Sequence, residues 1–201
     1  MRITAKAKAE TRARILEAAA NLFQINGFSQ TTTRDIARAT GLATGTLFNY
    51  FATKEELALN LVGTCLRDAE ADFQKRRHGG ESLEELLFAH VASTLRHLGE
   101  HRGYAETVLR AAATGERERI RAAHLGAVTQ LIEASDGAPS GLDLHLYWTL
   151  FLGVLNFWAG DESPHQEETL ALLDQSMKLF VECLAGRQDR SLEVNDGQIS
   201  G

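Results

Sequence analysis

Proline, cysteine and long apolar runs are scarce in this chain of 201 residues, and each scarcity excludes a class of protein. It contains only two Pro and two Cys. Because Pro is so rare and Ala, Leu and Glu are plentiful, the composition favours helix. Cys65 and Cys183 lie in apolar helical patterns and lack the close spacing of a metal or redox motif, which argues against a disulfide framework and for a reducing, cytoplasmic compartment.

No apolar run reaches the roughly 20 residues that a membrane span needs. The N-terminal segment has basic residues but not the apolar stretch of a cleaved secretory signal. We therefore expect a soluble intracellular protein without a membrane partner. The sequence also lacks a nucleophile elbow, a Walker loop, a dinucleotide fingerprint and a metalloprotease helix, so we assign no catalytic residue, cofactor or metal.

The formal charge of -6 conceals an asymmetry. Residues 1–54 carry eight Lys and Arg against three Asp and Glu, which gives this segment a charge of +5 and the remainder -11. A basic head on an acidic body suits a DNA-binding protein, because Lys and Arg replace counterions at phosphates while the acidic body is repelled. A chance asymmetry on a solvated surface is the alternative.

Apolar spacing and capping signals predict an all-α fold of about nine helices. The first three span about 10–26, 32–40 and 44–51, and a Thr53/Glu56 capping box begins a fourth that extends to about residue 74. We expect the others over 82–100, 103–113, 116–135, 142–158 and 167–184. The predicted domains are a helix-turn-helix DNA-binding domain (1–52), a ligand-binding and dimerisation domain (53–185) and a disordered polar tail (186–201).

Two short helices joined by a tight turn at Gly41 are typical of a helix-turn-helix, whose second helix enters the major groove. The segment TTTRDIARATGLATGTLFNYFATKEEL, from Thr31 to Leu57, resembles the TetR family of bacterial regulators. The resemblance rests on a Gly-x-x-x-Gly-Thr-Leu-aromatic-x-Tyr-Phe run, with Asp-Ile-Ala before it and Lys-Glu-Glu-Leu after it. It covers about the first 60 residues, whereas the rest agrees only in length and helix count.

The resemblance implies a set of operator contacts from the second and third helices and the start of the fourth. They include phosphate contacts, base or groove contacts and one close approach of the backbone. The matching residues are Thr33, Tyr50 and Lys54 for phosphate, Thr44 and Asn49 for bases or groove, Gly45 for the backbone approach, and Ala43 and Thr46 on the same face.

Two residues depart from the family pattern. Ala43 stands where the family usually has Ser, and Phe48 where it usually has Tyr, so one hydroxyl contact is in doubt at each position. Thr44 can compensate for the first, and we expect Phe48 to pack in the core. Lys6, Lys8 and Arg12 form either an arm on the DNA or a frayed terminus.

The helix over 142–158 is apolar nearly all round, so it must be covered on two sides. The last helix offers an apolar seam, and a two-fold four-helix bundle with a second copy would cover both, as the resemblance also implies. A monomeric core that contains both helices is the alternative. The expected interface residues are Tyr147, Phe151, Leu173, Met177, Phe180 and Leu184.

The body is rich in aromatic and amphipathic residues that suit an apolar ligand pocket with a few orienting polar atoms. Each of them alone also fits a packed core. His97 and His101, four residues apart, can share a helix face and bind metal, but we expect them to be solvated because no third ligand motif is near. The ligand-binding candidates are Phe88, His90, Tyr104, His124, Tyr147, Trp148, Phe151 and Asn156.

Together these features predict a ligand-responsive transcriptional regulator: a repressor that binds a palindromic double-stranded DNA operator as a homodimer and is released by a small apolar or aromatic inducer. A different possibility is a helical ligand-binding or interaction module that docks its basic head on an acidic protein or a membrane and does not bind DNA. A small helical enzyme that uses some of the seven histidines is a third.

Overall fold

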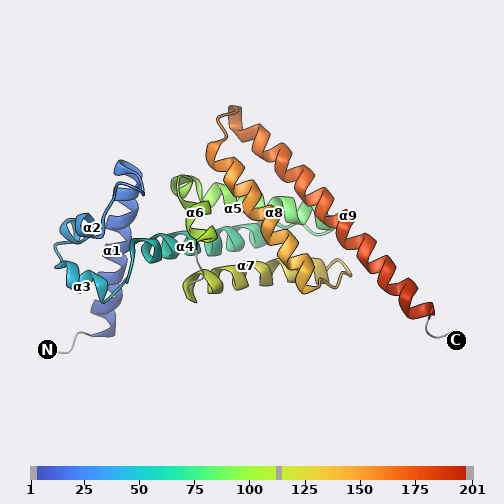
Figure 1. Cartoon of the computed structure of the whole chain (residues 1–201), viewed down its shortest axis with the longest axis horizontal. Coiled ribbons are helices and arrows are strands. Elements are labelled where there is room, and N and C mark those ends of the chain that lie inside the picture. Colours follow the sequence, from blue (N-terminus) through green and yellow to red (C-terminus); the bar gives the residue numbers. More distant parts are fainter. Residues whose placement is uncertain (1–3, 112–114, 198–201) are drawn as a thin grey trace. The chain divides into compact units, whose positions relative to one another are not determined.

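The computed structural model describes residues 4–111 and 115–197, with side chains as far as Arg187. Over these residues it contains nine α-helices and two short 3-10 helices, so the all-α prediction is confirmed (Figure 1). The α-helices are α1 (Ala5–Asn26), α2 (Thr33–Thr40), α3 (Thr44–Phe48), α4 (Lys54–Arg76), α5 (Leu83–His97), α6 (Ala105–Arg110), α7 (Gly115–Glu133), α8 (Gly141–Gly160) and α9 (Glu167–Gly197). The 3-10 helices are η1 (Gly99–His101) and η2 (Pro164–Gln166).

The chain forms two compact units. Unit 1 combines Met1–Arg67 with His97–Ile120, and unit 2 combines Asp68–Arg96 with Arg121–Gly201. The domain boundary expected from the sequence lay after residue 52 instead. The two divisions differ because α4 and α7 each pass from one unit into the other without a break, so neither a linker nor a change of composition marks the division.

In unit 1, capping interactions fix the ends of α2. The Thr32 hydroxyl oxygen accepts a hydrogen bond from the Asp35 N–H, and the Asp35 carboxylate accepts one from the Thr32 N–H, which completes a capping box. The side-chain hydrogen bond from Thr32 is the main cause that lowers the pKa of Asp35. Gly41 ends the helix in the left-handed region, with φ of 69°, where a side chain would be strained.

The first helix is held to its neighbours by two arginines. Arg14 donates to the Thr40 carbonyl at 3.0 Å and so joins α1 to the end of α2. The Arg12 guanidinium bonds the Asn60 side chain on α4 and lies 4.8 Å from the centre of the Phe51 ring. Arg12 is therefore engaged within unit 1, and the stretch considered as an arm is helical from Ala5 onwards.

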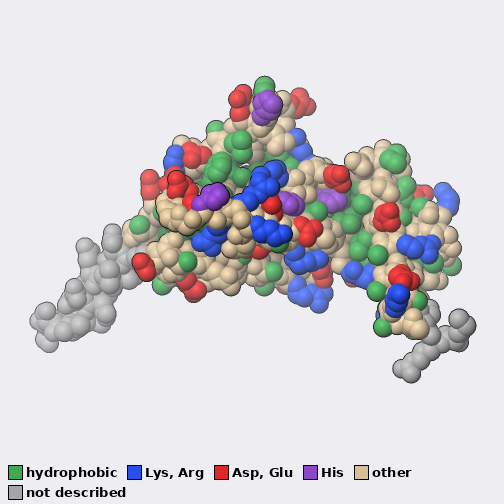
Figure 2. Space-filling model, turned by 180° about the vertical axis from the view of Figure 1, so that it is seen from behind, with side chains coloured by type: hydrophobic (Ala, Val, Ile, Leu, Met, Phe, Trp, Pro, Cys, Tyr) green, Lys and Arg blue, Asp and Glu red, His purple; other side chains and the backbone are tan. Residues whose placement is uncertain are grey.

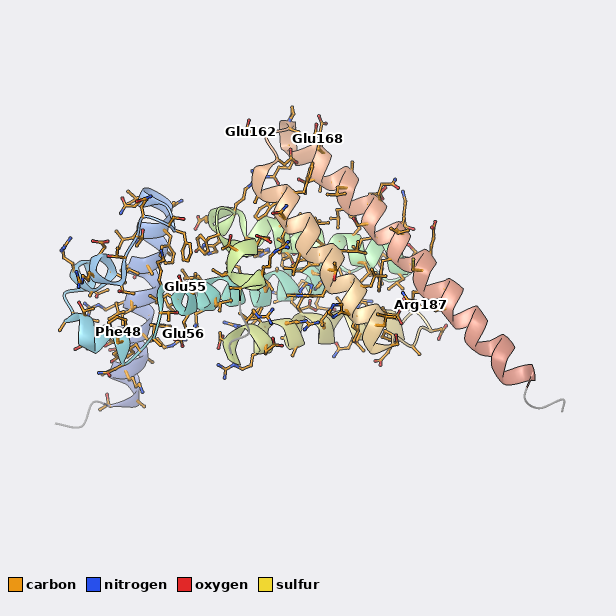
Figure 3. All side chains as sticks on the ribbon, in the orientation of Figure 1. Phe48, Glu55, Glu56, Glu162, Glu168 and Arg187 are labelled. Carbon is orange, nitrogen blue, oxygen red and sulfur yellow. The ribbon has the colours of Figure 1, made fainter. Side chains whose placement is uncertain are left out.

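In unit 2, α8 and α9 pack against each other. The Ser140–Asp143 capping box begins α8, and Arg187 of α9 lies 3.1 Å from the buried Asp143 carboxylate (Figure 3). Between the helices, the Asp161 carboxylate accepts hydrogen bonds from the N–H groups of Ser163 at 2.8 Å and Thr169 at 2.9 Å. These contacts fix the turn and the start of α9.

The last helix is longer than its apolar pattern predicts. We expected a disordered tail from residue 186, but the α9 backbone remains helical to Gly197. The extension has no Pro, and lengthening an existing helix is far more favourable than nucleating a new one. Residues 198–201 of the expected tail lie outside the described residues.

Candidate nucleic-acid interface and aromatic cluster

The short helix α3 presents most of the predicted DNA-contacting residues to solvent. Leu47 and Phe51, four residues apart, are buried and anchor this segment to the core of unit 1. The opposite face is open. Its exposed members are Ala43, Gly45, Thr46 and Asn49, and Thr44, Tyr50 and, on α2, Thr33 are partly exposed.

The polar side chains of this face have no partner inside the described parts of the chain. No hydrogen bond there reaches the side chains of Thr44, Thr46, Asn49 or Tyr50. Their donors and acceptors can exchange water for phosphate oxygens or base edges without breaking an internal bond. This arrangement is suited to a surface that binds a polar partner such as DNA.

Phe48 differs from the expectation of core packing. Its side chain projects from α3 and is 47% exposed (Figure 3). The buried face of this short helix is already occupied by Leu47 and Phe51, and each helical step turns the next side chain by about 100°. The sequence signal that could have revealed this is the Leu-x-x-x-Phe spacing, which leaves Phe48 beside the buried face.

Lys54 has a different setting from the polar residues of α3. Its ammonium group donates to the Phe28 carbonyl at 2.7 Å and lies 4.3 Å from the centre of the Phe28 ring. A second, longer bond of 3.4 Å reaches the Ser29 carbonyl. Lys54 therefore fixes the loop that follows α1, and of its three N–H donors only the remaining one is free for a phosphate.

Tyr104 belongs to unit 1, whereas the other ligand candidates belong to unit 2. Its ring stacks on Phe28 at 5.1 Å and meets the edge of Phe23 at 5.3 Å, and its hydroxyl lies 2.6 Å from His101 Nδ1. Burial raises the pKa of Tyr104 and lowers that of His101, which favours the neutral form of both groups. His101 was expected at the solvated surface, but α5 ends at His97 and η1 turns the next residues inward.

Five of the predicted ligand residues lie together in unit 2: His90, His124, Tyr147, Trp148 and Phe151. We call them the aromatic cluster. The His124 ring stacks on Phe151 at 4.4 Å, lies 4.9 Å from His90 and meets Trp148 edge-on at 5.8 Å. Its Nε2 atom is 3.3 Å from the Tyr147 hydroxyl. Burial, with a smaller effect of His90, holds the pKa of His124 well below its usual value, so this ring is neutral.

His90 connects the aromatic cluster to α4. Its Nε2 atom lies 2.8 Å from the Glu70 carboxylate, and this hydrogen bond is the main cause that lowers the pKa of Glu70. The other ring nitrogen, Nδ1, is buried and has no hydrogen-bond partner among the described residues. An unpaired buried polar atom costs about 1–3 kcal/mol, so a ligand group that bonds it would be stabilised there.

Two ligand candidates do not join the aromatic cluster. Phe88 is partly exposed on α5, and Asn156 is exposed on α8. Within the described ranges, no group of three or more side chains is arranged to hold a metal ion. No helix in those ranges is both long enough and apolar enough to cross a membrane.

The residues expected at a dimer seam lie in the core of the single chain instead. All six are at most 4% exposed, so they cannot meet a second copy without leaving their own core. The spacing showed which residues share a face but not which apolar face the chain itself covers. Hydrophobic side chains remain visible at the surface between charged ones (Figure 2). On α8 and α9 the large exposed ones are Leu142, Phe157, Leu170, Leu172 and Leu179.

Comparison with known proteins identifies both parts of the chain. Residues 15–61 match the family described as bacterial regulatory proteins, tetR family, and residues 89–192 match the tetracyclin repressor-like C-terminal domain. The chain is 38% identical over 87 residues to the HTH-type transcriptional repressor KstR2 of Rhodococcus jostii, a match that covers 43% of each chain. It is 29% identical over 99 residues to the uncharacterised HTH-type transcriptional regulator YfiR of Bacillus subtilis, which covers 49% of this chain and 46% of the relative. The matched segments thus span less than half of these relatives.

Solved structures share the fold over most of the chain. FadR of Thermus thermophilus, described as a TetR family transcriptional repressor in complex with lauroyl-CoA, is similar with a TM-score of 0.67 and 20% identity, and the match covers 85% of this chain and 93% of that one. FadR of Bacillus subtilis in complex with stearoyl-CoA has a TM-score of 0.61 and 18% identity, with 84% and 97% covered. The chain belongs to the TetR family of DNA-binding transcriptional regulators, which are not enzymes.

Proposed function

We propose that the protein is a repressor that binds a palindromic operator as a homodimer and is released by a small molecule with an apolar or aromatic body and a polar group. The observation that carries the proposal is the open polar face of α3, whose side chains have no hydrogen-bond partner in the described part of the chain. Relatives named as repressors support repression over activation.

The operator contacts follow from this face. Asn49 and Thr44 are placed to bond base edges, because they are polar, at least partly exposed and have no internal hydrogen bond. Thr33 and Tyr50 supply phosphate contacts, and Lys54 contributes its remaining N–H donor. Ala43, Gly45 and Thr46 complete the face, with Gly45 allowing the backbone to come close to the DNA.

Selection of bound sequences from random double-stranded DNA tests this function. A two-fold dimer presents two identical reading helices, so the selected consensus should be an inverted repeat with half-sites about 34–36 Å apart, or a multiple of that distance. Asn49→Ala should relax the base preference at one position of each half-site, whereas the matched control Asn21→Ala, at an exposed position of α1, should not. A consensus without dyad symmetry would contradict the proposed dimeric mode.

We place the dimer interface on the exposed apolar residues of α8 and α9. Leu172 and Leu179 are seven residues apart and therefore lie on one face of α9, and Phe157 is exposed on α8. Burial of such side chains against a second copy contributes about 25 cal/mol for each Å² of apolar surface. Sedimentation velocity should show a dimer that Leu179→Glu dissociates.

The ligand is proposed to bind at the aromatic cluster of unit 2. Three aromatic side chains and two histidines give it an apolar lining with polar atoms, and His90 Nδ1 has no partner within the described residues. A structural neighbour was solved with lauroyl-CoA and another with stearoyl-CoA, so lauroyl-CoA is a suitable first probe.

Control of DNA binding is proposed to pass through α4. Glu70, which bonds His90, lies on the same helix as Lys54, which fixes the loop after α1. A ligand that displaces Glu70 therefore changes the position of a helix that begins in unit 1. If the ligand lowers the affinity for DNA, linkage requires DNA to lower the affinity for the ligand by the same factor. Operator release should be measured for each compound that raises the melting temperature. If compounds that stabilise the protein never change operator affinity, control by this site is refuted while DNA binding stands.

A further inference from the structure

Arg121 of α7 is partly buried, yet it has no acidic partner among the residues that the structure describes. Two other partly buried arginines each pair with a carboxylate, Arg117 with Glu118 and Arg187 with Asp143. Within the described residues Arg121 has no such ion pair. Its Nη2 atom lies 3.4 Å from His145 Nδ1, and its Nε atom is buried without an acceptor. The guanidinium therefore has no carboxylate within ion-pair distance among the described residues.

The guanidinium lies beside the aromatic cluster. Its central carbon is 5.7 Å from the centre of the Trp148 ring. Trp148 in turn lies 5.4 Å from Phe151 and 5.8 Å from His124. All of these residues belong to unit 2, on α7 and α8. A cation thus lies over the Trp148 ring, beside the other rings of the aromatic cluster.

A partly buried guanidinium beside aromatic rings favours an anionic ligand. Partial burial weakens the hydration of a charge, so an anion that reaches Arg121 recovers the free energy that water no longer supplies. The planar fork of a guanidinium matches the two oxygens of a carboxylate. His145 is exposed and already close to the same edge. Aromatic rings next to the fork favour a flat or apolar body attached to the carboxylate.

We infer that Arg121 binds the carboxylate of an anionic effector whose aromatic body rests on Trp148 and the aromatic cluster. The inference rests on the ligand site proposed above and specifies the charge of the ligand. It excludes neutral molecules as the preferred effectors, because a neutral group leaves the guanidinium unpaired. It also assigns a ligand-binding role to a residue that the sequence pattern did not single out.

The test compares naphthalene-2-carboxylate with naphthalene-2-carboxamide, which has nearly the same shape but no charge, by isothermal titration calorimetry on the full chain. The carboxylate should bind at least about tenfold more tightly, the ratio expected for charge-assisted hydrogen bonds. Arg121→Gln should reduce the ratio to within about twofold. The matched control Arg119→Gln, which removes an equal charge from an exposed position of α7, should preserve it.

Equal binding of the two probes to the unaltered chain, or no saturable binding of the carboxylate, would overturn the inference, and neither result depends on the folding of a variant. A preference that survives in Arg121→Gln would overturn it as well. Gel-shift assays with the same probes separate it from the proposed function. If the carboxylate binds through Arg121 but never releases operator, the inference stands and ligand control at this site fails.

Discussion

On α3, polar side chains are exposed or partly exposed and have no hydrogen bonds within the described chain. In the aromatic cluster, by contrast, the buried His124 and Tyr147 are bonded to each other and the buried His90 is bonded to Glu70. The difference determines how each region can bind a partner. An exposed donor gains specificity because a partner replaces water without breaking an internal bond. A buried polar atom that is already hydrogen-bonded contributes to stability. A ligand therefore gains a new hydrogen bond only at a buried atom that has no partner within the described residues, such as His90 Nδ1 or Arg121 Nε.

The largest expected effect comes from a comparison of a buried and an exposed residue at two adjacent positions of α9. Phe180 is 0% exposed and Leu179 is 54% exposed. Phe180→Glu buries an unpaired charge, which costs several kcal/mol or more, so unit 2 should unfold. Leu179→Glu should leave the fold intact and dissociate the dimer. Circular dichroism measures the first result and sedimentation velocity the second.

The control for this pair is Ile25→Glu, which changes an exposed apolar residue of α1 that is 78% exposed. It should alter neither folding nor assembly. If Phe180→Glu folded normally and only the dimer dissociated, the seam first expected from the sequence would be right and the assignment of Phe180 to the core of the single chain would be wrong.

The second prediction concerns two neighbours at the end of α3. Asn49→Ala should lower affinity for the operator by about 1–3 kcal/mol and leave affinity for unrelated DNA unchanged, because it removes a base contact. Tyr50→Ala should weaken binding to every sequence, because phosphate contacts are the same in all DNA. Fluorescence anisotropy with operator and scrambled duplexes measures both. Equal losses for Asn49→Ala on the two duplexes would remove Asn49 from base reading.

Local signals in the sequence predicted the DNA-binding part well, because capping and turn chemistry act within a few residues. The turn at Gly41, which ends α2, forms as predicted. Contacts between residues that lie far apart in the sequence were harder to predict. Periodicity could not decide whether Phe180 faces its own core or a second copy. Nothing near Tyr104 indicated that it would pack on Phe23 and Phe28, which lie 81 and 76 positions earlier in the chain.

The third prediction uses the acid response of the turn between α8 and α9. Hydrogen bonds from Ser163 and Thr169 hold the pKa of Asp161 well below the ordinary value of 3.8. A carboxylate with a lowered folded-state pKa stabilises the fold above its unfolded value, and this contribution is lost as the pH falls below about 3.8 towards the folded value. Asp161→Asn should therefore lower the melting temperature at pH 7 and reduce its further decline below pH 4.

The matched control is Asp68→Asn, at an exposed aspartate of α4. It should leave the melting temperature at pH 7 nearly unchanged. Thermal denaturation followed at the helical circular-dichroism signal over a series of pH values gives both curves. Identical acid limbs for the unaltered chain and Asp161→Asn would show that this turn does not contribute to acid stability.

The smallest expected effect concerns Phe48, the exposed apolar residue among the polar side chains of α3. In the major groove an exposed phenyl ring can contact the methyl group of thymine, and one buried methyl group is worth about 0.8 kcal/mol. Replacing the contacted thymine by deoxyuridine removes only that methyl, so operator affinity should fall about fourfold. In Phe48→Ala the same replacement should have no effect, because the ring that contacts the methyl is gone. Ile25→Ala, an exposed apolar truncation on α1, should retain the full response to deoxyuridine. If deoxyuridine lowers the affinity of Phe48→Ala as much as that of the unaltered chain, the methyl is contacted by another residue. If it lowers neither, the ring of Phe48 does not read thymine, although the Asn49 prediction remains intact.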